Sequence, residues 1–175
     1  MARHFRHATA AALSLVIVLG GLASAQAQPP AVPAQNATLV VSGDVAQALT
    51  ITLADLKAMP RTTVTVGEGA QQTTYEGVLV GELLRRAGVP LGRDLSGPAL
   101  TTYVRASARD GYEVVFSVAE LDPAFTANDI IVADTNNGKP LLEAQGPFRL
   151  VAPRDKRAAR GVRMLLGLQV VRLVK

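Results

Sequence analysis

The sequence GPFRLVAPRDKRAARGVR, residues 146–163, decides how the fold is interpreted. A Gly-Pro pair opens it and Pro153 lies near its middle, and both are turn signals. Between them the short apolar run Phe148–Ala152 predicts a β-strand. This run contains one charge, Arg149, and a lone arginine inside an apolar strand normally needs a carboxylate or a bound anion as its partner.

A cluster of basic residues follows the second turn and makes the chain asymmetric in charge. Residues 149–175 hold eight Lys or Arg and one acidic residue, whereas residues 28–148 hold eight Lys or Arg and thirteen acidic residues. An acidic body with a basic end predicts an anion-facing surface at that end. The candidate ligand-binding residues are Arg149, Arg154, Lys156, Arg157 and Arg160.

A second interpretation of this cluster stays open. In it, Arg149 forms a salt bridge with a carboxylate of the acidic body, and the other basic side chains are solvated. Strand alternation puts Arg149 and Val151 on one face, whereas Arg154 lies beyond the proline. Whether the basic side chains converge on one cleft therefore depends on the conformation of the loop.

The N-terminal residues 1–27 have the pattern of a cleaved secretory signal peptide. Arg3 and Arg6 form a charged start, and Ala10–Leu22 is apolar but shorter than the roughly 20 residues of a comfortable membrane span. Two Ala-x-Ala cleavage signals follow within residues 23–27. An uncleaved anchor is the alternative. The two arginines do not form a twin-arginine pair, which favours export in the unfolded state.

The remaining chain predicts a disordered Pro/Ala/Gln leader at residues 28–36 and a single domain at residues 37–175. We expect a periplasmic or secreted protein that does not insert into the membrane once the signal is cleaved. Its small excess of positive charge and few aromatic residues argue against nucleic acid as a partner.

Two absences restrict the chemistry. The sequence has no cysteine, and its two histidines, His4 and His7, lie in the predicted signal peptide. The mature chain therefore lacks the side chains for a Cys/His zinc site, a Ser-His-Asp triad, a cysteine nucleophile or a disulfide. We assign no catalytic residue and no metal ligand.

The order of turns and apolar runs predicts an α+β fold with several small mixed or antiparallel sheets and two or three short helices. One helix is expected after Thr52, which forms a capping box with Asp55, and another over Val78–Ala87. A second capping box, Ser117 with Glu120, opens a single helical turn. Strands are expected at Thr38–Ser42, Leu49–Thr52, Thr62–Val66, Gln71–Tyr75, Thr101–Ala106, Tyr112–Phe116, Asp129–Ala133, Phe148–Ala152 and Met164–Leu173.

Four other polar side chains receive structural interpretations. Asp110 belongs to a tight hairpin turn, and Glu113 to the outer face of a strand. Tyr103 and Tyr112, on facing strands, are expected to pack against each other.

The ordered motifs resemble the oxidoreductase molybdopterin-binding domain family, which has the sulfite oxidase-type fold. They are LTITLADLKAMP (49–60), YEGVLVGELLRRAGV (75–89), DGY (110–112), FSVAELD (116–122) and GPFRLVAPRDKR (146–157). The resemblance covers about residues 37–172. It implies an α+β fold around a pterin-binding cleft, with the basic loop contacting an anionic cofactor or substrate.

The sequence departs from this family at the metal ligand. Catalytic members hold molybdenum by a cysteine thiolate on a loop before the segment matching Tyr75–Val78, but residues 66–72 contain no cysteine. Neither Glu68 nor Gln71 is an obvious substitute for a soft thiolate. We therefore expect a small exported relative that lacks the molybdenum centre and has no cofactor, with molybdopterin indicated by the resemblance alone.

Three functions remain. The first is a binding or accessory module for a small anionic ligand or a periplasmic partner protein. The second is a molybdopterin-dependent oxidoreductase with a ligand other than cysteine. The third is a purely structural or protein-interaction module of the cell envelope.

Overall fold

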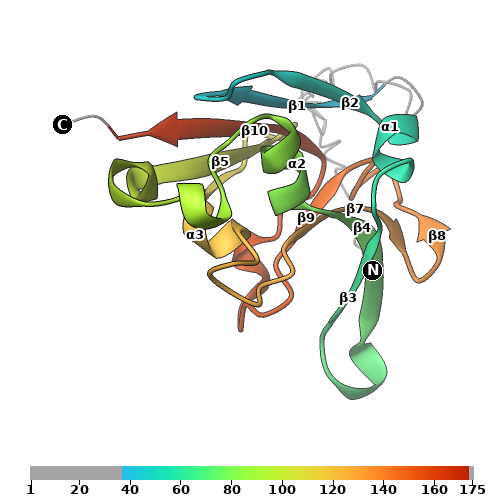
Figure 1. The fold of residues 1–175 in the computed structure, drawn as a ribbon. Helices are drawn as coiled ribbons and strands as arrows, with labels where there is room; N and C mark the ends of the chain where they lie inside the picture. Colours follow the sequence, from blue (N-terminus) through green and yellow to red (C-terminus); the bar gives the residue numbers. More distant parts are fainter. Residues whose placement is uncertain (1–36, 174–175) are drawn as a thin grey trace, which may run out of the picture. The chain divides into compact units, whose positions relative to one another are not determined.

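The computed structural model describes residues 37–173, and the expected signal peptide and leader lie outside the described residues. Within that range the chain forms ten β-strands and three short α-helices (Figure 1). The predicted α+β class, with small mixed and antiparallel sheets, is confirmed. Four 3-10 helices cover Gly69–Gln71, Gly92–Asp94, Gly97–Thr101 and Ala158–Arg160.

Sheet A is a mixed five-stranded sheet in the order β2-β1-β10-β5-β6. Its one parallel pair joins β1 to β10, so the first and last strands of the domain lie side by side. Its strands are β1 (Thr38–Gly43), β2 (Leu49–Thr52), β5 (Thr102–Ala108), β6 (Glu113–Ser117) and β10 (Leu165–Arg172).

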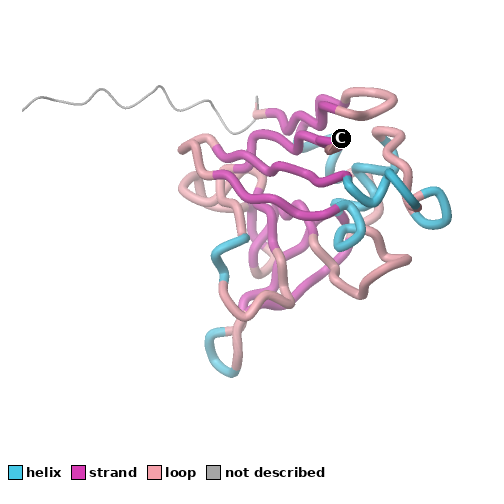
Figure 2. Tube along the Cα trace, turned by 90° about the vertical axis from the view of Figure 1, so that its left-hand side faces the viewer, coloured by secondary structure: helices cyan, strands magenta, loops and turns pink. Residues whose placement is uncertain are grey.

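Sheet B is antiparallel, in the order β3-β4-β7-β8, and β9 also pairs with β7. In Figure 2 the strands of sheet A run across the upper part of the view and those of sheet B lie below them. The strands of sheet B are β3 (Thr62–Val66), β4 (Thr73–Leu79), β7 (Ile131–Asn136), β8 (Lys139–Pro140) and β9 (Arg149–Val151).

Two of the three described helices begin at a local capping box. Both predicted capping boxes form, at Thr52 for α1 (Leu53–Lys57) and at Ser117 for α3 (Val118–Leu121). The longest helix among the described residues, α2 (Val80–Arg86), begins two residues later than predicted because β4 continues to Leu79 and pairs with β7. The sequence analysis predicted that this strand ends at Tyr75, which is too early, because the strand with which it pairs is distant in sequence.

The main core lies between sheet A and α2, and a smaller apolar cluster lies on sheet B. Fully buried Leu83 and Leu84 of α2 belong to the main core together with Leu39 and Val170 of sheet A. The smaller cluster consists of Val64, Tyr75, Ile131, Ala133 and Val151. Because β7 alternates between the two clusters, it is buried on both faces.

A β-bulge in β7 directs one carboxylate inward. The register of β4 against β7 shifts at this point, so that Glu76 faces Thr135 and Gly77 faces Ala133, which leaves Asp134 as the extra residue. The Asp134 side chain is 1% exposed and pairs with Arg61, which also contacts Glu76 at 2.9 Å. This ion-pair network ties the chain at the start of β3 to both β4 and β7.

The hairpin of β5 and β6 forms as predicted, but the expected packing of Tyr103 against Tyr112 is wrong. Tyr103 lies opposite Ser117, whereas Tyr112 lies in the turn before β6 and its hydroxyl donates to the carbonyl oxygen of Ala159. The two tyrosines lie at opposite ends of the hairpin, because the register pairs Tyr103 with Ser117 and the Ala108 N–H donates to the carbonyl oxygen of Tyr112. Among the described residues, no helix has the length and apolar character needed to cross a membrane.

Candidate functional site

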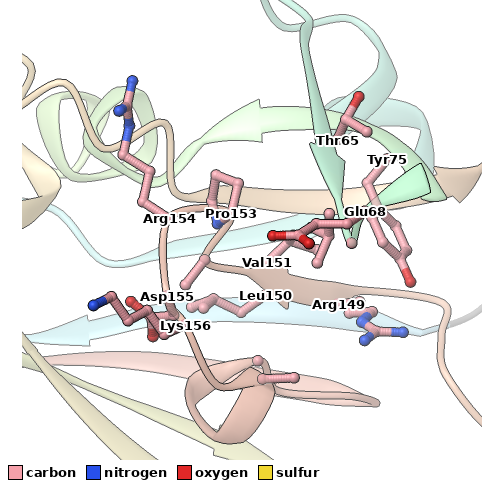
Figure 3. A pocket seen from close by; sticks show the side chains of 15 residues that line it. Thr65, Glu68, Tyr75, Arg149, Leu150, Val151, Pro153, Arg154, Asp155 and Lys156 are labelled. Atoms are coloured by element: carbon pink, nitrogen blue, oxygen red, sulfur yellow. The ribbon is translucent and has the colours of Figure 1, made fainter. Parts of the chain in front are cut away.

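A cavity of about 510 Å³ lies between the end of the β3–β4 hairpin and the basic loop after β9 (Figure 3). Residues 65–68 form one wall, and residues 149–156 with Ala158 and Gly161 form the other. Tyr75 of β4 also lines the cavity. The sequence singled out two segments, the basic loop and the loop at residues 66–72 where the family's cysteine is expected. Both segments border this one cavity.

Strand alternation explains why Arg149 reaches this cavity. Arg149 and Val151 share a face of β9, and β9 pairs with β7 so that Arg149 lies opposite Ala133. That face carries the small apolar cluster that includes Tyr75. The intervening Leu150 points the other way, into the main core. The predicted common face of Arg149 and Val151 is confirmed.

Arg149 is held without a carboxylate. Its guanidinium carbon lies 4.8 Å from the centre of the Tyr75 ring, which is cation–π geometry, and its Nη1 donates to Oε1 of Gln145 at 2.8 Å. Its buried Nε has no hydrogen-bond partner. Within residues 37–173 no acidic side chain forms a salt bridge with Arg149, so the alternative of a structural salt bridge is wrong there.

The other basic residues of the loop differ in position. Arg154 and Lys156 line the cavity, but the Nε of Arg154 donates to the carbonyl oxygen of Ala127 at 2.8 Å. Figure 3 shows the Arg154 side chain directed away from Arg149. Arg157 is exposed and lies outside the lining. The structure thus brings Arg149 and Lys156 to the cavity, with Arg154 at its margin.

Arg160 has a structural environment. Its guanidinium contacts Asp155 and Glu120, each at 2.7 Å, and lies 4.6 Å from the centre of the Phe116 ring. The hydrogen bonds to Asp155 and then Glu120 raise the pKa of Arg160 above its usual value, against the opposing effect of burial. Arg160 fixes the loop to α3 and does not line the cavity, so the candidate site is drawn without it.

Two cavity residues were not predicted as ligand contacts. Tyr75, which is 6% exposed, was recognised only as part of a motif. Glu68 was considered only as a replacement for a thiolate, yet its side chain lines the cavity beside the basic loop. The available signal was an aromatic residue with a polar hydroxyl next to the loop that lacks the family's cysteine.

A second cavity, of about 470 Å³, shares Arg149, Ala158 and Gly161 with the first. It is lined in addition by Arg163 and Gln145. Arg149 therefore lies at the boundary of two hollows. Among the described residues, no group of three or more His, Cys, Asp or Glu side chains is arranged to hold a metal ion.

Comparison with known proteins supports the fold and the family. Residues 66–173 match the family model described as "Oxidoreductase molybdopterin binding domain". The chain also resembles the crystal structure of the sulfane dehydrogenase SoxCD from Paracoccus pantotrophus, with a TM-score of 0.63 and 23% identity over 79% of this chain. The match spans only 39% of that longer chain. No curated protein sequence matches the chain.

Proposed function

Because the chain belongs to the oxidoreductase molybdopterin-binding domain family, we propose that it is an exported small-anion-binding or accessory module of that family, working without the molybdenum centre. Its ligand would enter the cavity between the β3–β4 hairpin and the basic loop. The proposal includes cleavage of residues 1–27, a short leader over residues 28–36, and a periplasmic or secreted location.

The observation that carries the proposal is the state of Arg149. Its guanidinium lies in a cavity, stacked on Tyr75, with a buried Nε that has no partner. A half-buried cation costs free energy unless an anion or a set of acceptors compensates it. Gln145 supplies one acceptor, so a bound anion is the natural source of the others.

The residues present are suited to the anionic group of the family's cofactor but not to its molybdenum. The unpartnered donor of Arg149 suits a phosphate or another oxyanion, and Lys156 adds a positive charge to the same lining. The protein ligand that the family uses for molybdenum is a thiolate, and this chain has no cysteine. The carboxylate of Glu68 is a hard ligand and an unlike replacement. We therefore derive no redox step from this site.

One observation favours the second candidate, a molybdopterin-dependent oxidoreductase with a ligand other than cysteine. Glu68 lies on the loop where the family's thiolate is expected, and its side chain lines the same cavity as Arg149. When bound, such a cofactor would supply two-electron redox chemistry. Arg149 and Lys156 would then bind its anionic group, and Glu68 would be the only carboxylate of the lining not already paired with an arginine.

We predict that phosphate stabilises the purified protein and that Arg149→Ala removes most of this effect. A charge-assisted hydrogen bond is worth about 1.5–3 kcal/mol, so the affinity for phosphate should fall roughly 10- to 100-fold. Thermal-shift titrations with phosphate and sulfate measure the change.

Arg157→Ala is the matched control for this experiment. It removes the same charge from the same loop but from outside the cavity lining, so it should change the phosphate titration little. Equal losses in the two variants would mean that the loop acts only through its net charge. An unchanged titration in Arg149→Ala would exclude the cavity as the binding site.

Metal analysis separates the first candidate from the second. We expect protein purified from its native compartment to contain far less than stoichiometric molybdenum, because the chain lacks a thiolate ligand. The measurement is elemental analysis of protein isolated under conditions in which a cysteine-containing family member, prepared in parallel, retains its metal. Stoichiometric molybdenum in this protein would overturn the proposal and favour the oxidoreductase.

A further inference from the structure

Two side chains of the cavity are not needed to bind a simple anion, and together they indicate a more specific ligand. They are the Tyr75 hydroxyl and the Glu68 carboxylate, which line the cavity that Arg149 also lines. Their chemistry differs, since a phenol donates a hydrogen bond and an ionised carboxylate only accepts.

The Tyr75 hydroxyl is a donor without a partner. Although the residue is 6% exposed, its hydroxyl is not among the buried polar atoms that lack a partner, so the oxygen reaches the surface of the cavity. No side-chain hydrogen bond joins it to a described residue, which leaves it free to donate to a ligand in the cavity. Since Arg149 lies over the Tyr75 ring, the phenol and the guanidinium form a donor-rich region on one side of the cavity.

Glu68 adds a negatively charged group to the cavity, opposite in sign to Arg149. The lining contains two carboxylates, but Asp155 is bound by Arg160 at 2.7 Å, whereas the side-chain carboxylate of Glu68 forms no salt bridge or hydrogen bond with any described residue. Figure 3 shows Glu68 projecting over Val151, between Arg149 and Lys156 in this view. A free carboxylate repels a ligand that is only an anion, but attracts one that also carries an ammonium group or N–H donors.

The dimensions of the cavity favour an organic molecule. Its volume of about 510 Å³ lies within the range of about 300–1,000 Å³ that is typical of small-molecule sites. Val151 and Pro153 supply apolar surface between the charged groups. An inorganic oxyanion would leave most of this space to water.

We propose that the cavity binds a bipolar organic ligand, whose oxyanion accepts hydrogen bonds from Tyr75 and Arg149 and whose ammonium or N–H group contacts Glu68. This inference rests on the proposed function as an anion-binding module and names the class of its ligand. The apolar middle of the lining would contact the carbon chain that joins the two ends.

The test compares two series of probes in calorimetric titrations with the full mature chain. One series consists of n-alkyl phosphates and the other of ω-aminoalkyl phosphates, with two to six carbons in each. At the best-fitting length, the aminoalkyl phosphate should bind about fivefold more tightly, as expected for one additional partly exposed ion pair. Net charge alone predicts the reverse order, because the alkyl phosphates are more negative.

Two conservative variants test which side chain contacts the ammonium group of the ligand and which contacts its oxyanion. Glu68→Gln should abolish the preference for aminoalkyl over alkyl phosphate while leaving alkyl phosphate binding equal or tighter. Tyr75→Phe should weaken both series about tenfold without lowering the melting temperature, because the hydroxyl has no partner in the protein. Tyr112→Phe is the matched control, since it removes a hydroxyl that donates to Ala159 outside this cavity, and should leave both affinities unchanged.

The outcomes separate this inference from the proposed function. If both series bind through Arg149 but the alkyl phosphates bind as tightly at every length, the anion site stands and the bipolar ligand is excluded. If Glu68→Gln retains the preference, the assignment of Glu68 is excluded. If no probe binds the wild-type protein, the anion-binding function and the inference fail together.

Discussion

Arg61→Met is expected to lower the free energy of unfolding by about 3–5 kcal/mol, the usual cost of removing one partner from a buried ion pair. The loss arises because the Asp134 side chain, 1% exposed, would be left as an unpaired charge inside sheet B. Glu76, the other partner of Arg61, is 43% exposed and can be solvated. Urea denaturation followed by circular dichroism measures the change.

Arg85→Met is the control for Arg61→Met. Arg85 is 65% exposed and pairs with Glu82 within α2, and exposed pairs of this kind contribute at most about 1 kcal/mol. The double variant Arg61→Met/Asp134→Asn should recover part of the stability, because it removes the orphaned charge as well. If Arg61→Met lowered the free energy of unfolding as little as Arg85→Met does, the Asp134 carboxylate would not be desolvated as the structure indicates.

We expect the same ion pair to affect the site as well. Arg61 fixes the start of β3, and the far end of β3 carries Thr65, which leads into the cavity wall ending at Glu68. Because strand pairing holds β3 only against β4, we expect Arg61→Met also to alter the position of this wall and to weaken phosphate binding.

Local sequence chemistry predicted the elements better than their contacts. The capping boxes at Thr52 and Ser117 and the β5–β6 hairpin formed as expected, since their partners lie within a few residues. The length of β4 and the bulge at Asp134 in β7 both depend on the pairing of these two strands, which lie more than 50 residues apart in sequence. No pattern within β4 specifies that pairing.

The same difference between local and long-range interactions applies to the candidate site. Alternation predicted that Arg149 and Val151 share a face, because that rule is local. The environment of Arg160 depends on Glu120, 40 positions earlier, and that of Arg154 on the carbonyl oxygen of Ala127. The basic residues after Pro153 looked equivalent in sequence, but long-range contacts fix Arg154 and Arg160, whereas Lys156 lines the cavity.

Gly77→Ala is the other substitution with a large expected effect. A Cβ at this position would lie 2.0 Å from the carbonyl oxygen of Val132 and 2.6 Å from the Cα of Ala133. Both are backbone atoms of β7, so the clash can be relieved only by separating β4 from β7. We expect a loss of at least about 3 kcal/mol in urea denaturation, at or above the upper end of the usual cost of overpacking.

Gly69→Ala provides the comparison for Gly77→Ala. Gly69 has a positive φ of 54°, but a Cβ there meets no atom within 4 Å, so the cost should be limited to the roughly 1–2 kcal/mol of the left-handed conformation. A similar loss at both positions would show that β4 and β7 can separate without penalty. The bulge at Asp134 already bends β7 beside Gly77. Any further displacement of β4 would move Tyr75, so a Gly77→Ala protein that still folds should bind phosphate more weakly than Gly69→Ala.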